Sequence, residues 1–366
     1  MDRRNFLKVS AAVAAMLPLR AWSAAPAAVA EDGWRQFVIT SRIEPVVVSG
    51  KTRVWVPLPS ITDAQWIRPL GNSWQGNAAQ MQVVSEAQYG ASMLYVEWAG
   101  ASEQHGAPWV EIVSRFATRD RATDFSRPAA PQPLAAAEHA LYTRPTKLLP
   151  LDGVVRDTAL QIVRGLNSDE EKARAIYDWV VDNTFREPKV KGCGIGDIRG
   201  MLETGNLSGK CADLNALYVG LARAAGLPAR DVYGIRVADS RRGYQSLGKS
   251  GDVSKAQHCR AEVYLQHFGW VPVDPADVRK VVLEEPPGKL ALDDAKVLAA
   301  RKQLFGAWEM NWLGYNFAHD VALPGSTGPL LPFLMYPQGE GADGRFDSLN
   351  AAAFRYRLSA TEVTAG

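Results

Sequence analysis

The sequence contains few cysteines and no extended basic run. Three cysteines occur among 366 residues, without a Cys-x-x-Cys pair or a cysteine–histidine cluster at zinc-binding spacing. A disulfide-rich scaffold and a structural zinc module are therefore excluded. Without a basic patch, a nucleic acid is not expected as a partner. No internal repeat of solenoid length is present either.

Long apolar runs are also missing, and the one near the N-terminus is short. Residues 1–30 have a charged start, a modest apolar run and small residues before Glu31. This is the order of an export signal, and the run is too short to span a bilayer comfortably. Residues 3–8 (RRNFLK) resemble a twin-arginine signal, with Asp2 where serine or threonine is usual. An uncleaved anchor is the alternative, but Pro18 and Arg20 interrupt the run. We expect an exported, periplasmic protein without a membrane span once the signal is removed.

The chain that follows is rich in strand-forming residues. Between residue 34 and about residue 125, short segments rich in Val, Ile, Trp and Tyr alternate with Gly, Pro, Asn and Ser. This pattern predicts a β-sandwich over residues 31–126. Residues 127–150 are rich in proline and alanine, which predicts an extended linker, with at most a short helical turn.

Helical periodicity begins after the linker. Ser168 and Glu171 form a capping-box pattern, and a second amphipathic helix begins at Cys211 and stops at Gly226. Three strand patterns follow, with a polar segment at 238–257 that we expect to be a mobile loop. The sequence therefore predicts an α+β unit over residues 151–285 and a C-terminal extension over 286–366 that packs on the other domains and includes a last strand, FRYRLSATEV (354–363).

Cys211 stands between a Gly-Lys pair and the start of its predicted helix. Unpaired N–H groups and the helix dipole favour an anion at this position, so the position lowers the pKa of a thiol there. The same N–H groups can bind an oxyanion, and Gly209 would let a substrate approach the backbone closely. The alternative is a small apolar side chain at the start of a buried helix.

His258 and Asp274 are the candidate partners of this cysteine. Both alternate with apolar residues along two neighbouring predicted strands, so they share one face if the apolar residues share the other. A direct pairing of His258 with Asp274 requires a connecting loop with an odd number of residues, for instance a five-residue loop from Tyr264 to Phe268. Spacing alone leaves open whether this histidine acts on Cys211 or only satisfies a hydrogen bond.

A resemblance to a known family favours the catalytic reading. The stretches GKCADLNALYVGLARAAGLPARDVYGIRV and HCRAEVYLQHFGWVPVDPADVRK resemble the core of the transglutaminase-like superfamily, within the papain-like group. The resemblance covers roughly residues 150–280. Arg260 is a departure, because a tryptophan is common there, and this could change how the site is shielded from solvent. The matching residues are Gly209, Cys211, Arg223, Ala224, Gly226, Pro228, Ala229, Arg230, His258, Glu262, Val263, Gly269, Trp270, Asp274 and Pro275.

The resemblance implies a papain-like core in which the cysteine-bearing helix packs on an antiparallel sheet. It also implies a triad in which Cys211 attacks an amide, His258 transfers the proton and Asp274 orients the imidazole. The expected reaction is acyl transfer or hydrolysis on a peptide or protein, protease-like rather than crosslinking, with no cofactor and no metal. The substrate, the second oxyanion donor and the oligomeric state are left open.

Two other functions compete with this reading. A non-catalytic module that binds a peptide or a partner would keep the fold without turnover, and a metal site could use Cys211, His258 and Asp274, although no fourth ligand is visible. Cys193 and Cys259 remain as a spare pair. A disulfide between them and two buried free thiols are alternative expectations.

Overall fold

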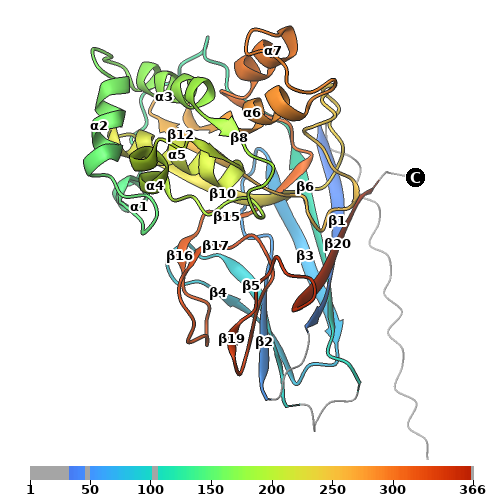
Figure 1. The fold of residues 1–366 in the computed structure, drawn as a ribbon. Helices are drawn as coiled ribbons and strands as arrows, with labels where there is room; N and C mark the ends of the chain where they lie inside the picture. Colours follow the sequence, from blue (N-terminus) through green and yellow to red (C-terminus); the bar gives the residue numbers. More distant parts are fainter. Residues whose placement is uncertain (1–32, 46–49, 101–105, 364–366) are drawn as a thin grey trace, which may run out of the picture.

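The computed structural model describes residues 33–45, 50–100 and 106–363. The predicted export signal at residues 1–30 lies outside these ranges. Figure 1 shows the helices gathered around a sheet at one end of the molecule and the long strands of two larger sheets at the other. Within the described ranges, no helix is both long and apolar enough to cross a membrane.

Two five-stranded sheets form a β-sandwich, with orders β11-β20-β1-β6-β3 and β19-β18-β2-β5-β4. Burial alternates along much of β1, and inward-facing Ile43 and Ile112 of one sheet share a core with Val54 and Val96 of the other. The predicted sandwich is therefore present. Its strands are β1 (Trp34–Pro45), β2 (Thr52–Pro57), β3 (Ile67–Gly76), β4 (Gln80–Ser85), β5 (Ser92–Trp98), β6 (Val110–Arg119), β11 (Gly251–Asp252), β18 (Gln338–Gly341), β19 (Gly344–Arg345) and β20 (Phe354–Val363).

The C-terminal part of the chain supplies strands to both of these sheets. The predicted last strand is confirmed as β20, which pairs antiparallel with β1 from Gln36↔Val363 to Pro45↔Phe354. β18 pairs with β2 in the second sheet. Residues 286–366 therefore supply strands to the sandwich itself. The predicted domain boundaries stay a prediction.

A third, antiparallel sheet has the order β13-β12-β10-β15 and carries the helix that begins at Cys211. That helix, α5 (Cys211–Ala224), packs on β10 and β12. The other face meets the sandwich, because Val232 and Ile235 share a core with Phe37 and Phe116. Both faces are therefore buried, and the polar side chains of β12 lie in the interior. The strands are β10 (Ala229–Arg236), β12 (Gln257–Leu265), β13 (Gly269–Val273) and β15 (Trp312–Asn316).

Helices surround α5 on the side away from this sheet (Figure 1). The predicted capping box is confirmed, since Glu171 N donates to Ser168 Oγ (3.1 Å) and Ser168 N donates to Glu171 Oε2 (3.0 Å). The predicted linker holds a helix longer than one turn, α1. The remaining elements are α1 (Ala136–Thr143), α2 (Gly153–Ile162), α3 (Asp169–Asn183), α4 (Ile198–Thr204), α6 (Pro275–Glu284), α7 (Ala295–Gln303), β7 (Arg121–Ala122), β8 (Phe185–Arg186), β9 (Ser208–Gly209), β14 (Ala307–Trp308), β16 (His319–Val321) and β17 (Leu331–Phe333).

The polar segment at 238–257 is tied to the sandwich. It contributes β11, which pairs with β20 at the edge of the first sheet. Arg242 also forms an ion pair with Asp120 (2.6 Å), and Arg241 forms one with Glu362 (2.9 Å). These contacts join the loop that precedes His258 to β20 and to Asp120, which directly follows β6.

Candidate active site

Cys211 is the first residue of α5 and is 4% exposed. The helix begins there because Asp213, two residues later, accepts a hydrogen bond from the backbone N–H of Lys210 (2.9 Å). The predicted apolar face, which includes Leu214 and Leu217, lies in the core. The cysteine therefore sits at the positive end of a buried helix, as the sequence predicts.

Asp213 also holds the loop that precedes α4. Its Oδ1 accepts hydrogen bonds from the backbone N–H groups of Ile195 and Gly196, each at 3.0 Å. A Cβ at Gly209 would lie 2.5 Å from the Cβ of Asp213. The glycine at 209 therefore makes room for Asp213, and close approach of a substrate at this position stays a prediction.

The structure brings His258 and Asp274 together. Nε2 of His258 lies 2.8 Å from Oδ2 of Asp274, and both side chains are buried. Leu265 pairs with Gly269, so the hairpin loop has three residues, and our five-residue loop is wrong. Both lengths are odd, so the two side chains share a face, as predicted. They meet diagonally, because Asp274 directly follows Val273, which pairs with Ala261.

Asp274 is held in place by its own helix and by α5. It is the N-cap of α6, where Oδ1 accepts a hydrogen bond from the Asp277 N–H (3.0 Å). Nδ2 of Asn215 lies 3.3 Å from the same oxygen and donates to the Cys259 carbonyl (2.8 Å). We did not identify Asn215 from the sequence, although an amide one helical turn after Cys211 on a buried helix is a signal for such a role.

A second carboxylate, which the sequence reasoning missed, also faces the histidine. Asp277 Oδ2 lies 3.4 Å from His258 Nε2, and its two oxygens lie 2.6 and 2.8 Å from Nη2 of Arg236. Asp277 follows Asp274 by three residues, so the two lie on one face of the first turn of α6. That spacing was visible in the sequence as the Asp-Pro-Ala-Asp run.

The carboxylates shift the acid–base balance of the site. Burial and Arg236 act to lower the pKa of His258, but Asp277 and Asp274 outweigh them and raise it to about 9. Despite its burial, the pKa of Asp277 lies well below its usual value because of Arg236 and His258. Burial and the neighbouring Asp277 raise the pKa of Asp274. The imidazolium form of His258 is therefore favoured at neutral pH.

The pKa of Cys211 lies well below that of an ordinary thiol. Hydrogen bonds from Cys193 and then from Cys259 outweigh the effect of burial, and His258 adds a hydrogen bond and its charge. Hydrogen bonding to Cys211 and then burial raise the pKa of Cys193, whereas burial and then hydrogen bonding to Cys211 raise the pKa of Cys259. The site therefore favours a Cys211 thiolate beside a His258 imidazolium, with two neutral thiols around it.

The expected Cys193–Cys259 disulfide is not formed. All three cysteines of the chain are buried free thiols. Cys193 Sγ instead lies 3.2 Å from the carbonyl oxygen of Gln257. The alternative expectation, two buried free thiols, describes the structure.

Arg260 lies behind the His258–Asp274 pair. Its Nε is 3.5 Å from Asp274 Oδ2, and its guanidinium lies 4.8 Å from the ring centroid of Trp312. Burial lowers the pKa of Arg260 to about 10. Trp312 Nε1 in turn donates to the His258 carbonyl (2.8 Å). At the position where the family often has tryptophan, this chain therefore has a cation that faces Asp274.

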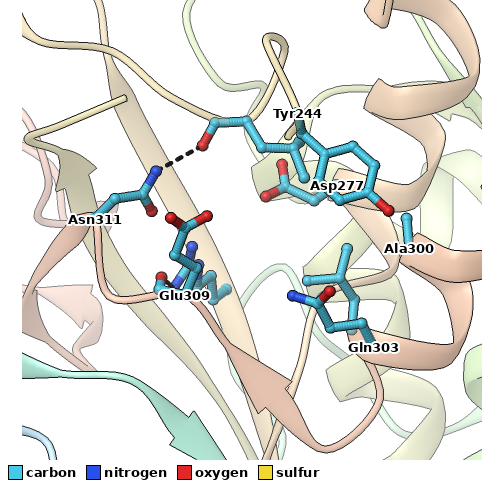
Figure 2. A pocket seen from close by; sticks show the side chains of 9 residues that line it. Tyr244, Asp277, Ala300, Gln303, Glu309 and Asn311 are labelled. Atoms are coloured by element: carbon cyan, nitrogen blue, oxygen red, sulfur yellow. Dashed lines mark hydrogen bonds between the residues drawn. The ribbon is translucent and has the colours of Figure 1, made fainter. Parts of the chain in front are cut away.

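A small polar pocket opens beside the second carboxylate. Figure 2 shows Asp277, Glu309 and Gln303 around it, with Asn311 donating to the Leu247 carbonyl (2.9 Å). Neither Cys211 nor His258 lines this pocket. It is therefore not the place where a substrate would meet the thiol.

The other described histidines have partners other than Cys211. His139 is exposed on α1, and His267 in the hairpin loop bonds to the carbonyl of Ala129. His319 is buried with its Nε2 3.2 Å from Asp231 Oδ2, a second histidine–carboxylate pair. Hydrogen bonding links only His258 among these to the cysteine.

A metal ion fits this cluster poorly. His258, Asp274 and Asp277 offer ligand atoms that all lie within 4.8 Å of one another. However, Arg236 is bound to one carboxylate and Arg260 lies beside the other. A cation would have to enter a site that two guanidinium groups already neutralise.

Comparisons with known proteins identify the family. Residues 156–275 match the transglutaminase-like superfamily, and the match includes Cys211, His258 and Asp274. An uncharacterized protein of Haemophilus influenzae is 35% identical over 332 residues, which cover 86% of this chain and 87% of that protein. The chain belongs to the transglutaminase-like superfamily. The resemblance seen in the sequence is confirmed.

One solved structure supports the fold of this transglutaminase-like protein. A putative cysteine protease from Cytophaga hutchinsonii aligns with a TM-score of 0.50 and 16% identity over 90% of this chain and 98% of that chain. The periplasmic domain of TgpA from Pseudomonas aeruginosa aligns with a TM-score of 0.34 and 17% identity over 67% and 88% of the two chains. At such identities, the first likeness concerns the fold alone.

Proposed function

We propose that this protein is an exported thiol enzyme that cleaves or transfers acyl groups at amide bonds of a peptide or protein. The observation that carries the proposal is the 2.8 Å contact between His258 and Asp274 beside a cysteine at a helix N-terminus. Cys211 is the nucleophile, His258 the acid–base and Asp274 the residue that orients the imidazole. All three are side chains of this chain, and the reaction needs no cofactor.

In the first step, the Cys211 thiolate attacks the carbonyl carbon and the oxygen becomes an oxyanion. The N–H groups of Ala212, Asp213 and Leu214 are already bonded to the carbonyls of Cys193 and Lys210. The backbone N–H of Cys211 itself is therefore the oxyanion donor that the helix provides. His258 then gives its proton to the leaving amine, and a thioester remains on Cys211.

In the second step, His258 takes a proton from water, which attacks the thioester and releases the acid. Nothing in the sequence selects an amine over water as the acceptor, so hydrolysis is the proposed outcome rather than crosslinking. A pocket lined by Ala212, Ala216, Tyr233 and Phe333 reaches the first turn of α5. We assign it to a small substrate group, because Ala212 directly follows Cys211 in the chain. His319 and Asp320 add polar atoms to its otherwise apolar and aromatic wall.

Acylation with p-nitrophenyl acetate tests the proposal without knowledge of the natural substrate. We expect a rapid release of one equivalent of nitrophenolate and an acetyl group on Cys211, found by peptide mass analysis. The Cys211→Ser variant should lose the rapid phase. A wild-type protein that reacts no faster than a free thiol would favour the alternative, a binding module that keeps the fold without turnover.

A further inference from the structure

Three sulfur atoms from separate parts of the chain meet at the start of α5. Cys193 lies in the loop between β8 and α4, Cys211 starts α5, and Cys259 lies on β12. The carbonyl of Cys193 accepts the Ala212 N–H (2.9 Å), and both neighbouring thiols hydrogen-bond to Cys211. The nucleophile of the proposed function is therefore within reach of two further thiols, which the proposed reaction does not use.

Such an arrangement is typical of cysteines that are oxidised reversibly. A reactive thiolate beside a second thiol can be converted to a disulfide before further oxidation destroys it. We infer that Cys211 and Cys193 form a reversible disulfide under peroxide, which switches the site off and protects the nucleophile. This inference goes beyond the proposed function and concerns a modification of Cys211.

The backbone around each thiol decides which one reacts. Cys259 is fully buried on a central strand, where it pairs with Tyr233, and its carbonyl is bonded to Asn215. Cys193 lies in a loop, flanked by Gly192 and Gly194 with φ of 57° and 88°. A disulfide requires a narrow range of Cα separations, and a loop adjusts to it more readily than a paired strand does. The loop residue Cys193 is therefore the resolving thiol.

The chemistry balances with hydrogen peroxide as the oxidant. The Cys211 thiolate attacks one peroxide oxygen and the O–O bond breaks. Hydroxide departs, and Cys211 becomes a sulfenic acid. The sulfur of Cys193 then attacks that of Cys211; the S–S bond forms, the S–O bond breaks, and the Cys193 proton leaves with the oxygen as water. A reducing thiol reverses the bond by exchange. While the disulfide exists, Cys211 cannot attack an acyl group.

Peptide mapping tests the assignment directly, because trypsin places the three cysteines in different peptides, 192–199, 211–223 and 256–260. The full chain is reduced, treated with equimolar peroxide, blocked with N-ethylmaleimide and digested. We expect a linked pair of 192–199 with 211–223 and loss of two free thiols. The Cys259→Ser variant should form the same link. In Cys193→Ser, dimedone should label a sulfenic acid in 211–223.

Two results would overturn the inference. One is oxidation of Cys211 to sulfinic acid in the wild type without any linked peptide. The other is a link between 211–223 and 256–260, which would make Cys259 the resolving thiol. Peptide mapping detects the disulfide directly and requires no turnover of a substrate. A failure of this inference is therefore distinguishable from a failure of the proposed function.

Discussion

Replacement of His258 by glutamine is expected to slow acetylation of Cys211 by p-nitrophenyl acetate about 100-fold or more at neutral pH. Cys193 and Cys259 hydrogen-bond to the Cys211 thiolate, but they are neutral, and His258 supplies the positive charge beside it. A buried anion without a counter-charge is costly, so the variant should hold Cys211 as the thiol. The rate constant of the rapid nitrophenolate release measures the effect.

The pH dependence of this rate gives a second reading of the same change. The pKa of Cys211 is lowered and that of His258 is raised to about 9, so the thiolate–imidazolium pair exists between these two values. The wild-type rate should therefore be nearly flat up to about pH 9. In His258→Gln the rate should rise with pH as it does for an ordinary thiol, so the loss is largest at low pH.

His267→Gln is the control, because His267 lies in the hairpin that joins β12 and β13 but bonds to the carbonyl of Ala129 and is not among the residues that line the pocket beside Cys211. It is expected to leave the rate and its pH profile close to those of the wild type. Equal rates for His258→Gln and the wild type would contradict the assigned role. Equal losses in the two histidine variants would mean that the effect comes from the fold.

Replacement of Asp277 by alanine is expected to destabilise the protein by about 3–5 kcal/mol. The change leaves the buried Arg236 without its carboxylate partner, which lies 2.6 Å from the guanidinium in the wild type. The free energy of unfolding in urea measures the loss. Asp252→Ala is the control, because Asp252 is an exposed residue 3.5 Å from Arg357, and such a surface pair contributes about 0–1 kcal/mol.

A double variant separates the cost of an unpaired charge from the cost of a lost side chain. Replacement of Arg236 by methionine together with Asp277 by leucine removes both charges and should recover much of the stability. The assignment fails if Asp277→Ala costs no more than Asp252→Ala, or if the double variant is less stable than Asp277→Ala alone.

The hairpin between β12 and β13 shows what strand alternation predicts and what it does not. Alternation placed His258 and Asp274 on one face, because the apolar residues of both strands share the other face, and any loop with an odd number of residues satisfies this. It does not fix the register, which depends on the turn. Gly269, with φ of 70°, closes a three-residue loop, a geometry that glycine adopts readily. The expected direct pairing therefore became a diagonal contact.

Long-range pairing accounts for the rest of what the sequence did not predict. β20 was expected as a strand, but its place beside β1 depends on partners more than three hundred residues apart. In the site, Asp213, Asn215 and Asp277 are polar residues on buried helical turns. Helical periodicity marks such positions as core, and only the hydrogen bonds formed after folding show that each of them supports Cys211, His258 or Asp274.

Alkylation by iodoacetamide at pH 6 tests the central claim most directly, because the three cysteines compete within one molecule. The peptides 192–199, 211–223 and 256–260 report each residue separately. The account predicts that 211–223 is carbamidomethylated at least about tenfold faster than a free thiol at this pH, while the other two peptides stay unlabelled. Equal labelling of all three peptides, or first labelling of Cys193 or Cys259, would contradict it.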